Sequence, residues 1–214
     1  MEVYTMKTIM LSPQSDKNAV KTAADLILQG EVVGMPTETV YGLAANALNG
    51  EAVAKIFRAK GRPQDNPLIV HIADFDQIYS LCPAVPPQAK ALAEAFWPGP
   101  LTMIVPKGGC IPDEVSCGLD TVGIRLPSHP LARDLIRTAG VPLAAPSANT
   151  SGRPSTTTAE HVLRDMDGKI AAILDGGPCG VGVESTVITL ALDKPRLLRP
   201  GGITLEQLRS VLGE

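Results

Sequence analysis

Two short loops of this chain gather lysine, arginine, hydroxyl and amide side chains, and glycine and proline stiffen both of them. The first runs from Lys60 to Pro67 and the second from Pro146 to Ser155. These side chains supply positive charge and hydrogen-bond donors, which a bound phosphate group requires. The Gly-x-x-x-x-Gly-Lys-Ser/Thr pattern of a P-loop is absent from the sequence, so we expect a phosphate site of a less common geometry.

Each of these residues also has a purely structural interpretation. Lys60 ends a predicted helix and could do no more than complement the helix macrodipole, an effect of roughly 0.3–1 kcal/mol. Arg62 has no such role, so we interpret Lys60 and Arg62 as a functional pair. Serine and asparagine commonly close turns through their own backbone. Their density beside Arg153 favours a binding site in the second loop, at Ser147, Asn149, Ser151 and Ser155.

Further polar residues stand at or just beyond the ends of predicted strands. In open α/β sheets, ligands bind in the crevice at such strand ends. Taken alone, His71 fits a buried structural histidine at least as well as a functional one. Arg125 lies inside an apolar strand and therefore needs either a carboxylate partner or an anionic ligand. We expect one shared cleft that includes Thr37, Thr39, His71, Arg125 and Ser147.

Two C-terminal motifs could also face a ligand. Glu184-Ser185-Thr186 follows a glycine-rich loop, and Arg199 ends a predicted strand before a tight turn, which suits a phosphate. Hydrolase signatures are absent: the sequence has no Gly-x-Ser-x-Gly elbow, no His-Glu-x-x-His and no cysteine in a nucleophile motif.

Helices and strands alternate along almost the whole chain. Apolar residues at helical spacing predict helices at 16–29, 51–60, 88–96, 131–138, 158–166 and 204–212. Short apolar runs predict strands at 31–35, 67–72, 101–105, 121–126, 141–145, 169–174, 185–190 and 196–199. Segment 107–120 lacks periodicity and is predicted to be a long surface loop or an irregular flap. The alternation predicts an α/β domain, and the short gap between the last two strands predicts an antiparallel hairpin within a mixed sheet.

Composition sets the outer bounds of the interpretation. The chain has 214 residues, 44% of them hydrophobic, and no repeat or linker divides it, so we expect one domain over residues 1–214. A net charge of -3 disfavours a generally nucleic-acid-binding surface but allows a local basic cleft. The Met1 end carries no signal-peptide pattern, and no apolar run reaches the ~18 residues of a membrane span. We therefore expect a cytoplasmic protein without a membrane contact and with reduced thiols at Cys82, Cys110, Cys117 and Cys179.

Seven motifs, in order within residues 15–205, resemble the YrdC-like threonylcarbamoyl-AMP synthases. They are Pro36-Thr37-Glu38-Thr39-Val40-Tyr41-Gly42-Leu43, Lys60-Gly61-Arg62-Pro63, Asn66-Pro67-Leu68, Trp97-Pro98-Gly99-Pro100-Leu101-Thr102, Arg125-Leu126-Pro127, Pro146-Ser147-Ala148-Asn149-Thr150-Ser151-Gly152 and Glu184-Ser185-Thr186-Val187. The resemblance implies a single α/β domain with a twisted mixed sheet around a positively charged cavity. Because the chain ends one helix after Arg199, it resembles the short, single-domain form of the family.

The resemblance also implies a reaction and a set of site residues. L-Threonine, bicarbonate and ATP would give threonylcarbamoyl-AMP and pyrophosphate, the first step towards threonylcarbamoyladenosine (t6A) in tRNA. The family's signature tetrad falls on Lys60, Arg62, Ser147 and Asn149. The implied ATP contacts fall on Arg62, Asn66, Thr121, Ser147, Ser155 and Arg199. The implied threonine contacts fall on Thr39, His71, Arg125, Ala145 (through its backbone) and Ser185.

These residue types suit a reaction that needs positioning and charge stabilisation rather than a protein nucleophile. Arg125 would pair with the threonine carboxylate. Mg²⁺ is expected with the triphosphate, although the sequence shows no carboxylate cluster that would bind it. Glu38 and Glu184 are the nearest carboxylates within the motifs. The expected macromolecular partners are an RNA or tRNA and a downstream threonylcarbamoyl transferase complex.

Two alternatives belong to other functional classes. The first is an RNA-binding module, for which we expect salt-sensitive RNA affinity without threonine-dependent turnover. The second is a relative that handles another carbamoyl-adenylate, as the similar domain of hydrogenase-maturation enzymes does. Pyrophosphate release, measured with and without threonine and bicarbonate, separates all three hypotheses.

Overall fold

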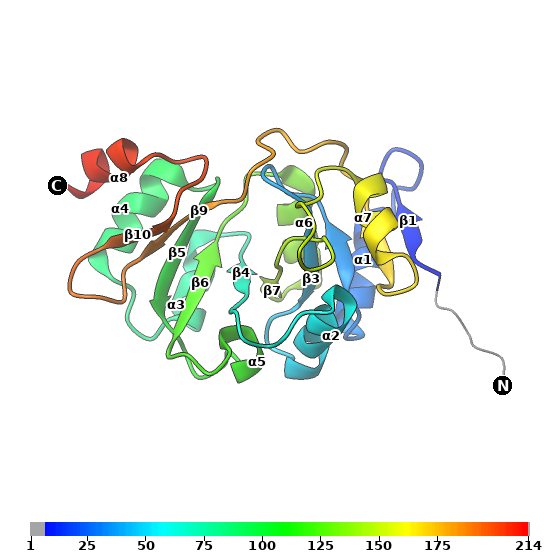
Figure 1. The fold of residues 1–214 in the computed structure, drawn as a ribbon, viewed down its shortest axis with the longest axis horizontal. Coiled ribbons are helices and arrows are strands. Elements are labelled where there is room, and N and C mark those ends of the chain that lie inside the picture. Colours follow the sequence, from blue (N-terminus) through cyan, green and yellow to red (C-terminus); the bar gives the residue numbers. More distant parts are fainter. Residues whose placement is uncertain (1–6, 214) are drawn as a thin grey trace.

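A ten-stranded mixed sheet runs along the length of the molecule (Figure 1). The computed structural model describes residues 7–213. The strands are β1 Ile9–Leu11, β2 Val33–Met35, β3 Gly42–Asn46, β4 Ile69–His71, β5 Leu101–Pro106, β6 Thr121–Arg125, β7 Leu143–Ala144, β8 Ala172–Leu174, β9 Thr186–Thr189 and β10 Arg196–Arg199. Their order in the sheet is β1-β8-β2-β3-β7-β4-β6-β5-β9-β10. Strand pairs β1–β8, β2–β8, β4–β6 and β5–β9 are parallel, and the other five are antiparallel.

The helices cover both faces of this sheet. They are α1 Ala19–Leu28, α2 Gly50–Lys60, α3 Ile78–Leu81, α4 Pro87–Phe96, α5 Asp113–Ser116, α6 Pro130–Ala139, α7 Ala159–Met166 and α8 Leu205–Leu212, with a 3₁₀ turn, η1, at Phe75–Gln77. Helix α1 packs on α6, and α4 packs on α8. Helices α4 and α8 lie beside β9 and β10 at one end of the molecule, and α7 lies near β1 at the other (Figure 1). None of the described helices is long and apolar enough to cross a membrane.

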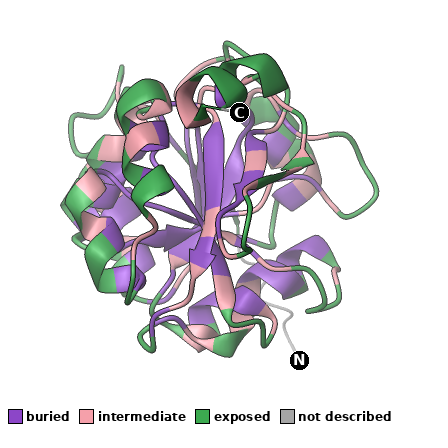
Figure 2. Cartoon of the chain, turned by 90° about the vertical axis from the view of Figure 1, so that its left-hand side faces the viewer, coloured by how far each residue is buried: buried purple, intermediate pink, exposed green. Residues whose placement is uncertain are grey.

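Alternating residues of the strands feed two separate cores, because successive side chains of a strand point to opposite faces. Val33 and Met35 of β2 pack with α1 and α6 on one face, whereas Val32 belongs to the larger core on the other. Strand β8 divides in the same way, with Ile173 in the larger core. Figure 2 shows the result as a buried sheet whose helices expose only their outer sides.

Helix α2 leads directly into the first cationic loop and fixes where that loop begins. The Asn49 side chain begins the helix by accepting the backbone N–H groups of Glu51 at 3.0 Å and Ala52 at 3.2 Å. Gly61 ends it in a left-handed conformation with φ of 61°. That turn directs the chain away from the helix axis and places Arg62 at the start of the loop.

The predicted α/β class and the mixed sheet are confirmed, and β9 and β10 form the predicted antiparallel hairpin. All six predicted helices are present, with ends shifted by up to three residues. Two strands were not predicted. Strand β1 has three residues and lies at the sheet edge, and β3 is a Gly-Leu-Ala-Ala-Asn run whose small residues have low strand propensity. The signal-peptide prediction concerns the Met1 end, which lies outside the described residues.

The prediction of a long surface loop or an irregular flap at residues 107–120 is correct in part, because the segment is irregular on both sides of the one-turn helix α5. The segment contains α5, buries Val115 and Ser116, and is fixed by backbone hydrogen bonds at both ends. Lys107 N–H donates to Asp120 O at 2.9 Å, and Gly108 N–H donates to Leu81 O at 2.8 Å. Leu68 N–H donates to Val115 O at 2.8 Å, which ties this segment to the entry of β4. Burial of the α5 turn, which sequence periodicity over four residues cannot reveal, stabilises the segment.

Candidate functional site

A polar cavity of about 210 Å³ opens where the ends of several strands meet. Its walls come from the β2–β3 turn, the loop after α2, and the residues at or next to the ends of β4, β6, β7, β9 and β10. The prediction that these strand ends share one cleft is confirmed. Nine of the predicted site residues line it: Thr39, Arg62, Asn66, His71, Arg125, Ala145, Ser147, Ser185 and Arg199.

Four predicted site residues are not in the cavity wall. Thr121 begins β6 and pairs with Pro106 at the far end of that strand from Arg125. Ser155 lies behind Glu184, with its Oγ 3.4 Å from a carboxylate oxygen of that residue. Lys60 and Asn149 are buried, at 3% and 6% exposure, and do not line the cavity. The Lys60 ammonium and Asn149 Nδ2 contact the second loop, to which Asn149 itself belongs, and Asn149 Oδ1 is buried without a hydrogen-bond partner among the described residues.

Lys60, at the end of α2, and Asn149, within the second cationic loop, hold that loop in place. The Lys60 ammonium donates to the backbone carbonyl of Asn149 at 2.7 Å and to that of Ser147. Asn149 Nδ2 donates to the carbonyls of Thr150 at 3.0 Å and Arg153 at 2.7 Å. Burial, with the nearby charge of Arg62, lowers the pKa of Lys60 to about 8. The pair therefore positions Ser147 in the cavity wall from a buried site.

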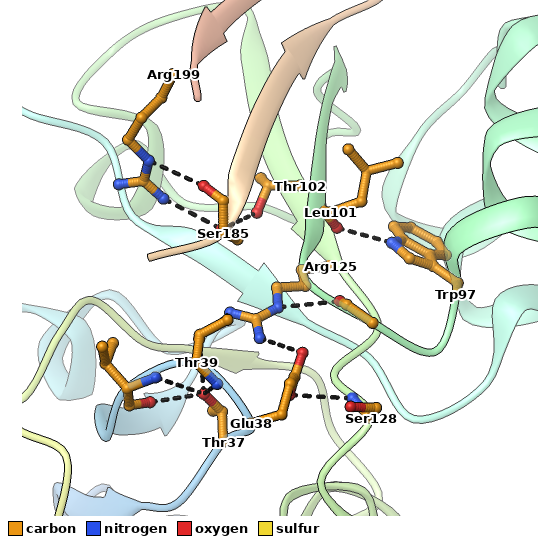
Figure 3. A network of polar contacts seen from close by, with 12 residues as sticks. Thr37, Glu38, Thr39, Trp97, Leu101, Thr102, Arg125, Ser128, Ser185 and Arg199 are labelled. Atoms are coloured by element: carbon orange, nitrogen blue, oxygen red, sulfur yellow. Dashed lines mark hydrogen bonds and ion pairs between the residues drawn. The ribbon is translucent and has the colours of Figure 1, made fainter. Parts of the chain in front are cut away.

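Arg125 is the best-anchored cation of the cavity (Figure 3). Its side chain is 5% exposed, and Nη2 donates to Glu38 Oε1 at 2.5 Å. Nη1 donates to Thr39 Oγ1 at 3.0 Å, and Nε donates to Gly99 O at 3.3 Å. Glu38 Oε2 in turn accepts the Ser128 N–H at 3.1 Å. The carboxylate partner that the buried arginine requires is therefore Glu38, from the β2–β3 turn.

His71 is Arg125's neighbour in the parallel pairing of β4 and β6. It is 3% exposed, and its Nδ1 is buried without a hydrogen-bond partner among the described residues. Burial, and then the charge of Arg125, lower the pKa of His71 to about 3. The imidazole is therefore neutral at physiological pH and faces the cavity as a dipole rather than a cation.

Arg199 organises the opposite wall (Figure 3). Its guanidinium forms an ion pair with Glu184, donates from Nε to Ser185 O at 3.0 Å, and donates from Nη2 to Ser185 Oγ at 3.1 Å. Ser185 Oγ also lies 2.8 Å from Thr102 Oγ1. Within residues 7–213, by contrast, the Arg62 guanidinium contacts only the carbonyl of Asn66 at 3.0 Å and the Phe57 ring at 6.0 Å.

The glycine-rich segment 176–182 is fastened over the β2–β3 turn. Tyr41 Oη donates to Gly177 O at 2.8 Å and accepts Gly176 N–H at 3.1 Å. Val181 N–H and Gly182 N–H donate to the carbonyls of Glu38 at 2.8 Å and Thr39 at 3.0 Å. These bonds fix the backbone that carries Glu38 and Thr39. Burial raises the pKa of Cys179, within this segment, to about 11, so its thiol stays protonated at neutral pH.

The described residues contain no group of three or more His, Cys, Asp or Glu side chains that could hold a metal ion. Glu38 and Glu184, the carboxylates nearest the cavity, are both engaged by arginine. The four cysteines are free, as predicted.

Comparison with known families and proteins places this cavity in context. The Sua5/YciO/YrdC family model, described as telomere recombination, matches residues 25–201. This chain belongs to that family. The resemblance inferred from the seven motifs is thereby confirmed, and the motifs lie within the matched range.

Two relatives with more than 50% sequence identity to this chain are named threonylcarbamoyl-AMP synthase. The chain is 60% identical over 198 residues to the threonylcarbamoyl-AMP synthase of Bacillus subtilis (strain 168), a match that covers 91% of this chain and 56% of that protein. It is 54% identical over 195 residues to the threonylcarbamoyl-AMP synthase of Pyrococcus abyssi (strain GE5 / Orsay), covering 91% of this chain and 57% of that protein. The chain thus spans somewhat more than half the length of these relatives.

A solved family structure has the same fold. The crystal structure of P. abyssi Sua5 complexed with L-threonine superposes with a TM-score of 0.93 at 51% identity, covering 97% of this chain and 61% of that one.

Sequence reasoning did not assign roles to three residues of the site. Thr102 stands in a quoted motif, but a threonine inside an apolar strand has no pattern that reveals its partner. Tyr41 is fully buried as a core residue, and only the fold brings the glycine-rich segment to its hydroxyl. Glu38 was recognised as a nearby carboxylate, yet its pairing with Arg125 joins residues 87 positions apart.

Proposed function

We propose that this chain catalyses L-threonylcarbamoyl-AMP synthesis from L-threonine, bicarbonate and ATP. The observation that carries the proposal is the convergence of Arg62, Arg125, Ser147, Ser185 and Arg199 on one small polar cavity. The names of the relatives at 60% and 54% identity support the same reaction.

The chemistry balances without a covalent enzyme intermediate. The threonine amine condenses with bicarbonate to an N-carboxylate and releases water. A carbamate oxygen then attacks the α-phosphorus of ATP, forming the new P–O bond, and the bond to the β-phosphate oxygen breaks to release pyrophosphate. Such a reaction needs two substrates held in line and a counter-charge for the leaving group. The cavity supplies donors and cations for both tasks and no side chain positioned as a nucleophile.

Arg125 and His71 suit the amino-acid half of the cavity. Arg125 has five N–H groups, three of which are engaged by Glu38, Thr39 and Gly99. Two donors remain for a substrate carboxylate, so that group could bind beside Glu38 without displacing it. The neutral imidazole of His71 adds a polar contact without placing a second cation against Arg125.

Arg62, Asn66, Ser147 and Arg199 suit the nucleotide half. The cavity of about 210 Å³ is below the roughly 300–1,000 Å³ of common small-ligand pockets. It has room for threonine and one end of the nucleotide, and the rest of ATP would extend past its mouth. Arg62, without a carboxylate partner among the ion pairs of residues 7–213, is the cation best placed to meet phosphate charge.

We also propose that Mg²⁺ arrives with the triphosphate, because the carboxylates at the cavity are occupied by arginine. Phosphate oxygens and water would supply most of its ligands, as is usual for Mg²⁺ bound with nucleotides. When bound, the ion neutralises charge on the departing pyrophosphate.

The downstream partners follow from the product. A threonylcarbamoyl adenylate is an activated acyl donor, so we propose a cytoplasmic transferase complex that passes the threonylcarbamoyl group to tRNA, with direct RNA contact as a secondary expectation. Free thiols at all four cysteines agree with a reducing compartment.

Pyrophosphate release tests the proposal, measured with ATP and Mg²⁺ in the presence and absence of L-threonine and bicarbonate. We expect release only when both are present, and mass spectrometry should detect threonylcarbamoyl-AMP. Arg62→Ala should abolish release without loss of thermal stability. Arg209→Ala, which removes an exposed arginine on α8, is the matched control and should retain full activity. Release that ignores threonine would overturn the proposal.

A further inference from the structure

Thr102 is a fully buried hydroxyl directly behind the cavity wall. It lies in β5, opposite Arg125 of β6 and beside Val187 of β9 in the sheet register. Its Oγ1 is 2.8 Å from Ser185 Oγ, and Ser185 is itself 2% exposed and lines the cavity. Figure 3 shows Ser185 between Thr102 and Arg199. Thr102 does not line the cavity, so any effect on a ligand must pass through Ser185.

The hydrogen-bonding capacity of these groups fixes the direction of the Thr102–Ser185 bond. A hydroxyl has one donor and two acceptor positions. Arg199 Nη2 can only donate, and it donates to Ser185 Oγ at 3.1 Å, which uses one acceptor position of Ser185. Within residues 7–213, Thr102 Oγ1 has Ser185 as its sole hydrogen-bond partner. If Ser185 donated to Thr102, the Thr102 proton would be a buried donor without an acceptor, which costs about 1–3 kcal/mol.

In the opposite direction the unmatched proton is that of Ser185, which lines the cavity, and Thr102 is satisfied. Thr102 donates to Ser185 Oγ, Arg199 donates to the same oxygen, and both acceptor positions of Ser185 are filled. The Ser185 proton then has no protein acceptor in this network and is left for the cavity. Ser185 therefore presents a hydrogen-bond donor, and only a donor, to whatever binds there.

We infer that Thr102 is a positioning residue that fixes Ser185 as a dedicated hydrogen-bond donor for an acceptor oxygen of the amino-acid substrate. The inference rests on the proposed function. A carboxylate oxygen is the chemistry that fits, since Thr102 and Arg125 lie opposite each other on one face of antiparallel strands. The Ser185 hydroxyl and the free Arg125 N–H groups then form a wall made of donors alone. A substrate carboxylate satisfies both, whereas an amide in its place would turn N–H groups towards N–H groups.

Equilibrium binding of L-threonine by calorimetry, combined with steady-state pyrophosphate release, tests this role. Thr102→Val removes the donor and conserves shape; we expect Kd and KM for threonine to rise about 3–10-fold, the value of one hydrogen bond, with kcat within about 2-fold of wild type. Thr102→Ser restores the hydroxyl and should restore threonine affinity. In the Ser185→Ala background, Thr102→Val should change the Kd for threonine by less than about 2-fold, because the Ser185 hydroxyl that Thr102 positions is already absent.

Thr8→Val provides the matched control. Thr8 is a buried threonine whose hydroxyl lies 2.8 Å from Ile170 O and 3.2 Å from Met166 O, away from the cavity. Its loss should lower thermal stability and leave threonine binding unchanged. Unchanged affinity in Thr102→Val would overturn the inference. So would equal losses in Thr102→Val and Thr102→Ser, or full additivity with Ser185→Ala. If the wild-type protein binds no threonine, the proposed function fails first, and the inference fails with it.

Discussion

His71 should make this protein unusually sensitive to mild acid. The imidazole is 3% exposed and stands next to Arg125, and both burial and that charge disfavour its protonated form. Its pKa is about 3 in the folded protein and 6.5 in an unfolded chain. Between these values the unfolded state binds a proton that the folded state does not. The free energy of unfolding must therefore fall as the pH drops through this range.

The size of the effect follows from the two pKa values. Once the pH is well below 6.5, each further unit costs about 1.4 kcal/mol until the folded state also protonates near pH 3. Integrated from pH 7 to pH 4, one such histidine removes about 3 kcal/mol. This is a large share of the 5–15 kcal/mol by which domains are typically stable.

Urea unfolding of wild type and His71→Asn at pH 7, 5.5 and 4 measures this contribution. Other titrating groups cancel in the difference between the two proteins, so wild type should lose about 3 kcal/mol relative to the variant on acidification. His161→Asn, which removes an exposed histidine on α7, is the control and should follow the wild-type curve. NMR titration of the His71 ring gives a direct check. A midpoint near 6.5 in the folded protein would refute the reasoning.

Three further perturbations test other parts of the site. Burial holds the pKa of Lys60 near 8, below its ordinary 10.5, so the unfolded state binds more protons between these values. Wild type should gain stability over Lys60→Met as the pH rises through that range, by up to about 1.4 kcal/mol per unit in urea unfolding. Glu38→Gln leaves the Arg125 guanidinium buried without a counter-charge and should cost about 3 kcal/mol in the same assay; a loss below about 0.5 kcal/mol would contradict the importance of the pair. Gly201→Ala would bring Cβ within 2.4 Å of a backbone nitrogen and should lower stability by about 2 kcal/mol or more, whereas Gly109→Ala meets nothing within 4 Å and should be neutral in thermal melts.

Most helices and strands could be predicted from the sequence because local residue patterns determine them. Apolar spacing and glycine stops located helices such as α1 and α2, and short apolar runs located the strands that carry His71 and Arg125. Strand β3 was missed because Gly42, Ala44 and Ala45 are poor strand formers held in place by neighbours on both sides. Tertiary pairing, which no local pattern encodes, decides that segment.

In the site, too, some features could be predicted from local sequence and others depend on tertiary contacts. Residue types and motif order brought together the side chains that line the cavity, and the requirement that Arg125 have a partner was predictable from the cost of a buried charge. Which partner it has was not, since Glu38 reaches it only through the β2–β3 turn. The buried positions of Lys60 and Asn149 were equally inaccessible to sequence, because a lysine looks the same whether its ammonium meets a phosphate or a backbone carbonyl.

The ion pairs of the cavity affect how it competes with the ions of its surroundings. Three arginines line the cavity. Arg125 and Arg199 each form an ion pair with a glutamate of the protein, whereas Arg62 has no such partner within residues 7–213. The protein thus supplies most of its own counter-ions, and few need to be released to the buffer when an anionic ligand enters. Its affinity for substrate should depend only weakly on ionic strength, unlike that of sites that recruit mobile salt ions. Phosphate and sulfate should likewise be poor competitors everywhere except beside Arg62.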